Sequence, residues 1–195
     1  MSHPISRYPV PKLEDLPKDI REKMEQVQEK AGFIPNVFVT LAHRPDEFRA
    51  FFGYHDALML CDSGLTKAER EMIVVATSGV NHCLYCVIAH GAILRIYAKN
   101  PQIADQVGVD HRKADITPRQ KAMLDFACKF ARAPEAMLES DYLCLRDHGF
   151  SEEDIWDIGA ITAFFALSNR MAHLTSMRPN DDFYLMGRVP PPGKK

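Results

Sequence analysis

The sequence predicts an all-α protein with a single domain. Apolar residues recur at helical spacing, three segments begin with helix-capping signals, and one segment near the C-terminus is apolar on nearly every side. With 195 residues, of which 46% are hydrophobic, the chain can bury a sizeable core and fits one domain better than two. We expect a helical bundle with its core at about 13–177, followed by an extended C-terminal arm over 178–195.

Periodicity and turn residues predict three helices in the first third of the chain. Apolar residues at helical spacing indicate a helix over 17–31, which Gly32 ends. Proline followed by asparagine or aspartate then precedes a short helix over 37–43 and a longer one over 46–60. A turn over 61–64 separates these helices from the rest of the chain.

Three capping signals mark later helix starts. Thr66 and Thr117 each stand three residues before a Glu or Gln, and Ser151 stands three residues before an Asp. The threonine or serine oxygen and the side chain three residues later satisfy amide donors that a helix start leaves free. The helix after Ser151, over about 152–173, is apolar nearly all round, so we expect it to be the central core helix.

Charge and hydropathy exclude several classes of function. The 24 basic and 26 acidic residues are scattered and give a formal net charge of -2, so the chain has no electrostatic footprint for nucleic acid or an anionic membrane. The N-terminus lacks the basic start and apolar core of a signal peptide, and no stretch reaches about 18 apolar residues. We expect a soluble, cytoplasmic protein.

The five cysteines comprise three isolated residues and one close pair. Cys61, Cys128 and Cys144 have no partner at motif spacing and are expected to be small apolar residues. Cys83 and Cys86 are separated by two residues, and in a reducing cytosol such a pair serves redox chemistry or metal binding more often than permanent cross-linking. The pair is therefore the main candidate for a functional site.

A predicted helix over about 82–99 places this pair in its first turns. Cys83 and Cys86 share a helical face, close enough for a disulfide, and His90 lies one turn further along the same stripe. The positive end of the helix dipole favours a thiolate there. A thiolate attacks the outer oxygen of a peroxide to give a sulfenic acid, which a neighbouring thiol converts to a disulfide and water.

Glu71 lies on the predicted helix before the one that carries the cysteine pair and His90. It lies among apolar residues, where a carboxylate normally needs a partner. The order and spacing of Glu71, Cys83-x-x-Cys86 and His90 resemble the signature of alkylhydroperoxidase-D (AhpD) proteins in the carboxymuconolactone decarboxylase superfamily. The segments 32–36, 81–91 and 169–171 are similar to the peroxidase-related members of that superfamily, and the resemblance covers roughly residues 10–188.

The resemblance implies an AhpD-like helical bundle that assembles into homo-oligomers and binds no cofactor. It implies a thiol-dependent peroxidase for hydrogen peroxide or organic hydroperoxides. Glu71 and His90 would deprotonate Cys86 as the nucleophile, and Cys83 would resolve the sulfenic acid. The reductant stays open between a lipoylated protein, thioredoxin and glutaredoxin.

Tyr85 is a departure from the best-known AhpD proteins, which carry histidine directly before the second cysteine. Its hydroxyl could bind a substrate hydroperoxide, and its ring could equally form a pocket wall or pack in the core. His55 is interpreted as a surface or core histidine outside the catalytic set. Asn169 and Arg170 end the apolar run of their helix and are given structural roles.

Three alternatives use the same residues. Cys83, Cys86 and His90 could bind zinc, but His82, the nearest fourth ligand, points away from the stripe, so no metal is expected. A redox-sensing or disulfide-exchange protein would use the same disulfide without catalysis, as sestrin relatives suggest by analogy. Lactone decarboxylases of the superfamily generally do without the cysteine pair, so its presence argues against that activity.

Overall fold

A computed structural model describes residues 4–188, and within that range the chain is helical without any strand, which confirms the predicted all-α fold. Its α-helices are α1 (Lys18–Ala31), α2 (Asn36–Leu41), α3 (Pro45–Met59), α4 (Lys67–Val80), α5 (Leu84–Ala98), α6 (Ile103–Asp110), α7 (Pro118–Arg132), α8 (Glu139–Asp147), α9 (Glu152–Thr175) and α10 (Asp182–Leu185). Three short 3₁₀ helices join them: η1 (Leu13–Asp15), η2 (His111–Lys113) and η3 (Pro134–Ala136).

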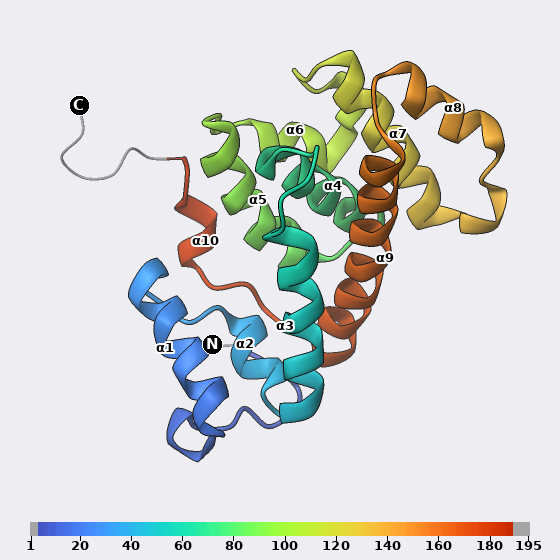
Figure 1. The fold of residues 1–195 in the computed structure, drawn as a ribbon. Coiled ribbons are helices and arrows are strands. Elements are labelled where there is room, and N and C mark those ends of the chain that lie inside the picture. The colour runs from blue at the N-terminus through green and yellow to red at the C-terminus, as the bar shows by residue number, and fades with distance from the viewer. Residues whose placement is uncertain (1–3, 189–195) are drawn as a thin grey trace.

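Helix α4 is the centre of the bundle. It packs against α5, α6, α7 and α9, and most of its side chains are buried. Figure 1 shows α1 and α2 at one end of the molecule, α7 and α8 at the other, and α9 running between them. The expectation that the apolar helix over 152–173 is the central one is therefore wrong, because α9 leaves apolar side chains such as Leu167 and Leu174 about half exposed.

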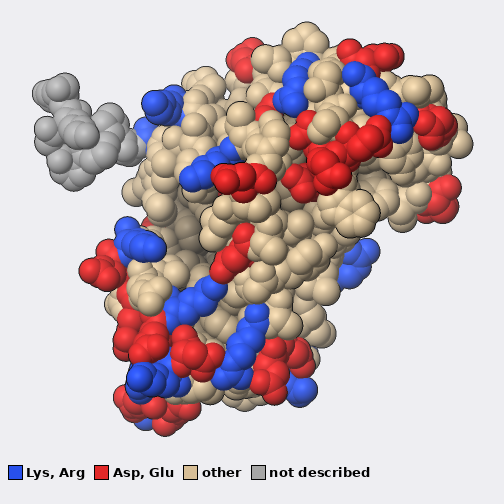
Figure 2. Space-filling model, viewed as in Figure 1, with Lys and Arg blue, Asp and Glu red and all other residues tan. Residues whose placement is uncertain are grey.

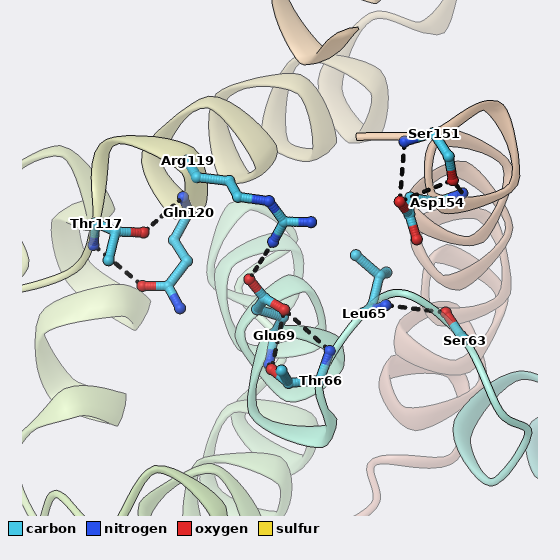
Figure 3. A network of polar contacts seen from close by, with 9 residues as sticks. All are labelled: Ser63, Leu65, Thr66, Glu69, Thr117, Arg119, Gln120, Ser151 and Asp154. Atoms are coloured by element: carbon cyan, nitrogen blue, oxygen red, sulfur yellow. Dashed lines mark hydrogen bonds and ion pairs between the residues drawn. The ribbon is translucent and has the colours of Figure 1, made fainter. Parts of the chain in front are cut away.

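The predicted capping boxes are present at all three helix starts. Thr66 accepts from the amide of Glu69 at 3.2 Å, while its own amide donates to the Glu69 carboxylate at 2.9 Å. Thr117 with Gln120 and Ser151 with Asp154 repeat this exchange (Figure 3). Glu69 also pairs with the Arg119 guanidinium at 2.6 Å, so the start of α4 is joined to the start of α7.

The junction between α4 and α5 differs from its predicted form. Helix α4 ends at Val80, and α5 begins at Leu84, two residues later than the start of the helix predicted over about 82–99. Gly79 lies so close to α6 that a Cβ there would be 2.5 Å from the Gly108 carbonyl oxygen. This close approach is the reason for a glycine in the last turn of α4.

The C-terminal segment folds back onto its own chain up to residue 188. Its short helix α10 buries Phe183, whose ring packs edge-on against Phe33 at a centroid distance of 5.0 Å. Arg95 of α5 donates to the carbonyls of Phe183 and Met186 at 2.7 and 2.8 Å. The extended arm expected over 178–195 is thus wrong for 178–188, and residues 189–195 lie outside the described part.

The surface and the helix lengths agree with the composition. On the face in Figure 2, Lys and Arg side chains lie beside Asp and Glu at the upper and lower ends of the molecule, and much of the surface between them carries no charge. Between residues 4 and 188, none of the helices is both long and apolar enough to cross a membrane.

Candidate active site

The cysteine pair lies where α4 turns into α5. His82 adopts a left-handed conformation with φ of 52°, which is unusual for a residue with a side chain, and it turns the chain sharply between the two helices. Cys83 is then the N-cap residue of α5, and Cys86 lies in the first turn. Cys83 therefore precedes the helix rather than lying within it, but the shared face expected for the two thiols is present.

The pKa values of the two thiols are shifted in opposite directions. The pKa of Cys83 is lowered to about 6, first because Cys86 hydrogen-bonds to its sulfur. The backbone amide of Cys86, the charge of His173 and the side chain of Asn169 lower it further, against the opposing effect of burial. The pKa of Cys86 is raised, because it shares its proton with Cys83 and because it is buried. Of the two sulfurs, Cys83 therefore loses its proton more readily, and Cys86 keeps its proton to higher pH.

Helix α9 supplies a polar row along the cysteine stripe. Ser168 lies with its oxygen 3.7 Å from the Cys86 sulfur. The Asn169 side chain accepts a hydrogen bond from the side-chain amide of Asn81 at 2.9 Å and donates one to the Ser78 hydroxyl at 3.0 Å. These two bonds fix the Asn169 side chain beside the thiols. His173 hydrogen-bonds to the carbonyl of Asn81 at 3.0 Å.

These α9 residues were missed as site residues by the sequence analysis. Asn169 and His173 are one helical turn apart, and Ser168 and Asn169 directly follow the apolar segment 158–167. A buried polar side chain next to such a segment needs a partner, which was the available signal. Asn169 was assigned a structural role, and its hydrogen bonds support that role as well as an effect on the thiols.

Glu71 and His90 form a buried pair. Glu71 is 5% exposed, and its carboxylate lies 2.8 Å from Nδ1 of His90. A carboxylate on Nδ1 holds the proton there and leaves Nε2 of the neutral ring as an acceptor. The ring of Phe165 packs edge-on against His90 at 4.7 Å. Among the hydrogen bonds of the described residues, Cys86 has one to Ser168 and none to His90.

Tyr85 joins the site to the N-terminal helices. Its hydroxyl accepts from the backbone amide of Val37 at 3.1 Å, and burial raises its pKa. The hydroxyl that could have bound substrate is thus engaged with α2. The alternative interpretation, a pocket wall, fits the ring, which borders a cavity next to Cys83.

This cavity is the opening at the cysteine pair. It has a volume of about 280 Å³ and lies between the start of α5 and the end of α9. Cys83, Tyr85, His173, Ser176 and Arg178 are among its walls, whereas Cys86 is not. A larger, mostly apolar groove of about 660 Å³ between α3 and α9 contains none of the four predicted catalytic residues.

His55 approaches the site from α3. Its ring packs against Phe164 and Phe165, and its Nδ1 lies 2.9 Å from the Asp56 carboxylate. Its pKa is lowered, mainly by burial, with a smaller contribution from His90. His55 is thus a partly buried histidine with a carboxylate partner, and among the interactions of the described residues it has none with the thiols.

Metal binding gains no support from the geometry. Between residues 4 and 188, no three or more His, Cys, Asp or Glu side chains form a cluster that could hold a metal ion. Of the other cysteines, Cys61 and Cys144 are exposed and Cys128 is buried. Burial raises the pKa of Cys128 to about 11, which makes it a poor nucleophile.

Two solved structures resemble this chain over nearly their whole length. One is the AhpD core of an uncharacterized peroxidase-related protein from Ralstonia eutropha JMP134, with 70% identity and a TM-score of 0.96, covering 97% of this chain and 100% of that one. The family model of the carboxymuconolactone decarboxylase family matches residues 45–106. The chain belongs to the AhpD-like branch of this family.

The second AhpD-like relative is an uncharacterized peroxidase-related protein from Silicibacter sp. TM1040, with 40% identity and a TM-score of 0.90, covering 94% of this chain and 96% of that one. The debrominase Bmp8 shares only the fold, at 18% identity and a TM-score of 0.77 over 94% of this chain and 95% of that one. No curated protein sequence matches this AhpD-like chain. The residues matched by the family model include Glu71, the cysteine pair and His90.

Proposed function

We propose that the protein is a thiol-dependent peroxidase that reduces hydrogen peroxide or organic hydroperoxides through the Cys83–Cys86 pair. The observation that carries the proposal is the close Cys83–Cys86 pair at the wall of a cavity, where a hydrogen bond from Cys86 lowers the pKa of Cys83. A thiolate supplies the nucleophile, and a thiol within reach resolves the sulfenic acid that forms. Membership of a peroxidase-related branch supports the same activity.

The proposed cycle begins at Cys83. Its thiolate attacks the outer oxygen of the hydroperoxide, the O–O bond breaks, and the alkoxide leaves and takes up one proton. Cys86 then attacks the sulfur of the Cys83 sulfenic acid, and its thiol proton leaves with the hydroxyl group as water. The protein ends with a disulfide, and the peroxide has been reduced by two electrons.

The family resemblance implies the opposite order, with attack by Cys86 and resolution by Cys83. The unequal pKa values favour Cys83 as the attacking sulfur, because Cys86 keeps its proton to higher pH. The cavity also favours Cys83, since this residue lines it and Cys86 does not. Attack by Cys86 stays a prediction of the resemblance.

We propose that Glu71 and His90 act on the Cys86 proton. The carboxylate fixes the imidazole tautomer that leaves Nε2 able to accept a proton, one helical turn beyond Cys86. Direct contact is absent in the described reduced form, so the transfer would pass through a water molecule or Ser168. We also propose a homo-oligomer in a reducing compartment such as the cytoplasm, with no bound cofactor.

Repeated turnover distinguishes a peroxidase from a redox sensor that does not catalyse peroxide reduction. Reduced protein is mixed with excess hydrogen peroxide or cumene hydroperoxide and a dithiol, and peroxide loss is followed with time. A peroxidase consumes many equivalents per chain, and either Cys83→Ser or Cys86→Ser abolishes this, whereas Cys144→Ser leaves it unchanged. One equivalent consumed per chain, with no further turnover, would favour a redox sensor instead.

A further inference from the structure

The cavity beside Cys83 carries positive charge at its mouth. Arg178 and His173 both line it, and both side chains are exposed. No carboxylate of residues 4–188 forms an ion pair with Arg178, whereas about half of the other arginines have one. The ring of His173 is held on the cavity wall by its hydrogen bond to the Asn81 carbonyl at 3.0 Å.

The rest of the cavity is small and partly apolar. Its volume of about 280 Å³ lies just under the range of about 300 to 1,000 Å³ for drug-sized ligands. Ala172 and Met177 give it an apolar floor, and both are buried. Ser176 on its wall is the C-cap of α9 and ends the helix in a left-handed conformation with φ of 54°.

We propose that this cavity binds the reducing substrate, and that the substrate is a small thiol carrying a carboxylate group. The inference rests on the proposed Cys83–Cys86 disulfide. The thiol sulfur would reach Cys83 across the apolar floor, while the carboxylate would lie near Arg178 and His173 at the mouth. A neutral thiol of equal size would gain only the apolar part of this interaction.

The reaction balances at Cys83. The incoming thiolate forms a bond to the Cys83 sulfur, the Cys83–Cys86 bond breaks, and Cys86 leaves as a thiolate that takes up a proton. A second molecule of the same thiol then attacks the substrate sulfur of the mixed disulfide. This step releases the substrate disulfide and restores the Cys83 thiolate, so two thiols are oxidised and one protein disulfide is reduced.

A matched pair of probes tests the proposed charge selection. Protein carrying the mapped Cys83–Cys86 disulfide is reduced in a single turnover by 3-mercaptopropionate or by neutral 3-mercaptopropionamide, with rates expressed per thiolate. We expect the carboxylate to react about three- to fivefold faster at low salt, and the advantage to shrink as salt rises. Arg178→Gln should bring the two rates together, and Arg178→Lys should keep most of the difference.

The controls separate this inference from the proposed function. Arg132→Gln removes an exposed arginine of α7 that does not line the cavity, and it should leave the ratio of rates unchanged. In Cys86→Ser protein, the oxidised probe should form a stable mixed disulfide on Cys83. Equal rates for the two probes in the unmodified protein, or a ratio insensitive to Arg178→Gln, would overturn the inference alone. If peroxide yields no Cys83–Cys86 disulfide, the proposed function falls, and this inference falls with it.

Discussion

Cys83 and Cys86 have the same side chain and different environments, and the position of the helix start explains the difference. Cys83 is the N-cap of α5, where the amide of Cys86 and the charge of His173 stabilise a thiolate. Cys86 is buried one turn later against Ser168 and keeps its proton. Sequence spacing predicts that the two sulfurs meet, but it cannot rank their acidity. That ranking depends first on which thiol donates to the other, and then on burial and on contacts with His173 and Asn169 of α9, which the sequence does not show.

Trapping with dimedone should identify the sulfur that reacts first. In Cys86→Ser protein, peroxide should produce a persistent sulfenic acid on Cys83, because the resolving thiol is missing. In Cys83→Ser protein, the oxidation of Cys86 should be much slower at pH 7, since its raised pKa leaves little thiolate. Mass spectrometry of the dimedone adducts measures both. The opposite pattern would show that Cys86 attacks the peroxide, as the family resemblance implies.

The alkylation of Cys83 by iodoacetamide should follow its lowered pKa. The thiolate is the reactive form, so the rate should rise as pH increases through about 6 and level off near neutrality. Asn169→Ala should move this midpoint upward, because the asparagine side chain helps to lower the pKa. Peptide mapping after timed alkylation gives the rate for each cysteine. A midpoint close to the ordinary cysteine value of 9.0 would contradict the assigned thiolate.

Glu71 and His90 were paired from the sequence, and the 2.8 Å contact confirms that they meet. If the pair acts on the Cys86 proton, Glu71→Gln and His90→Asn should each slow disulfide formation after the sulfenic acid forms. The double variant should be scarcely slower than the poorer single one, because the residues act as a unit. Single-turnover rates at several pH values measure this effect, which should shrink at high pH. Multiplicative losses would show that the two residues act independently.

At the scale of the helices, local signals predicted the starts of α4, α7 and α9 correctly, because a capping box is formed within four residues. Helices α6 and α8 were not predicted, since they are short and have weaker start signals. The central place of α4 was also missed. Burial depends on which helices surround an element, and the apolar pattern of α9 alone could not show that one of its faces borders an open groove.

The packing of α4 on α6 gives a stability prediction. Gly79→Ala should destabilise the protein by about 1 to 3 kcal/mol, because the new methyl group would lie 2.5 Å from the Gly108 carbonyl oxygen. Gly159→Ala is the matched control within α9, where a Cβ meets nothing within 4 Å. Alanine there should stabilise the helix by up to about 1 kcal/mol. Denaturant unfolding of both variants measures the changes, and similar effects at the two positions would contradict the close approach.

At the scale of the whole molecule, the site is assembled from segments that the sequence separates widely. Tyr85 binds the amide of Val37, and Asn81 binds Asn169, so α2, α4, α5 and α9 all converge on the cysteine pair. The helix that carries Cys86 and His90, with Cys83 at its start, could be predicted from local spacing. The return of 178–188 onto α5 could not, because the residues that receive Phe183 lie far from it in the chain and carry no local signal of the contact.

The most direct test of this account is the pairing formed by reduced protein with one equivalent of hydrogen peroxide. Samples quenched over the time course are alkylated and mapped by mass spectrometry. The account predicts rapid loss of two thiols and one intramolecular Cys83–Cys86 disulfide, while Cys61, Cys128 and Cys144 remain alkylatable. A principal disulfide that includes any of those three cysteines, or thiols that survive the peroxide unchanged, would contradict it.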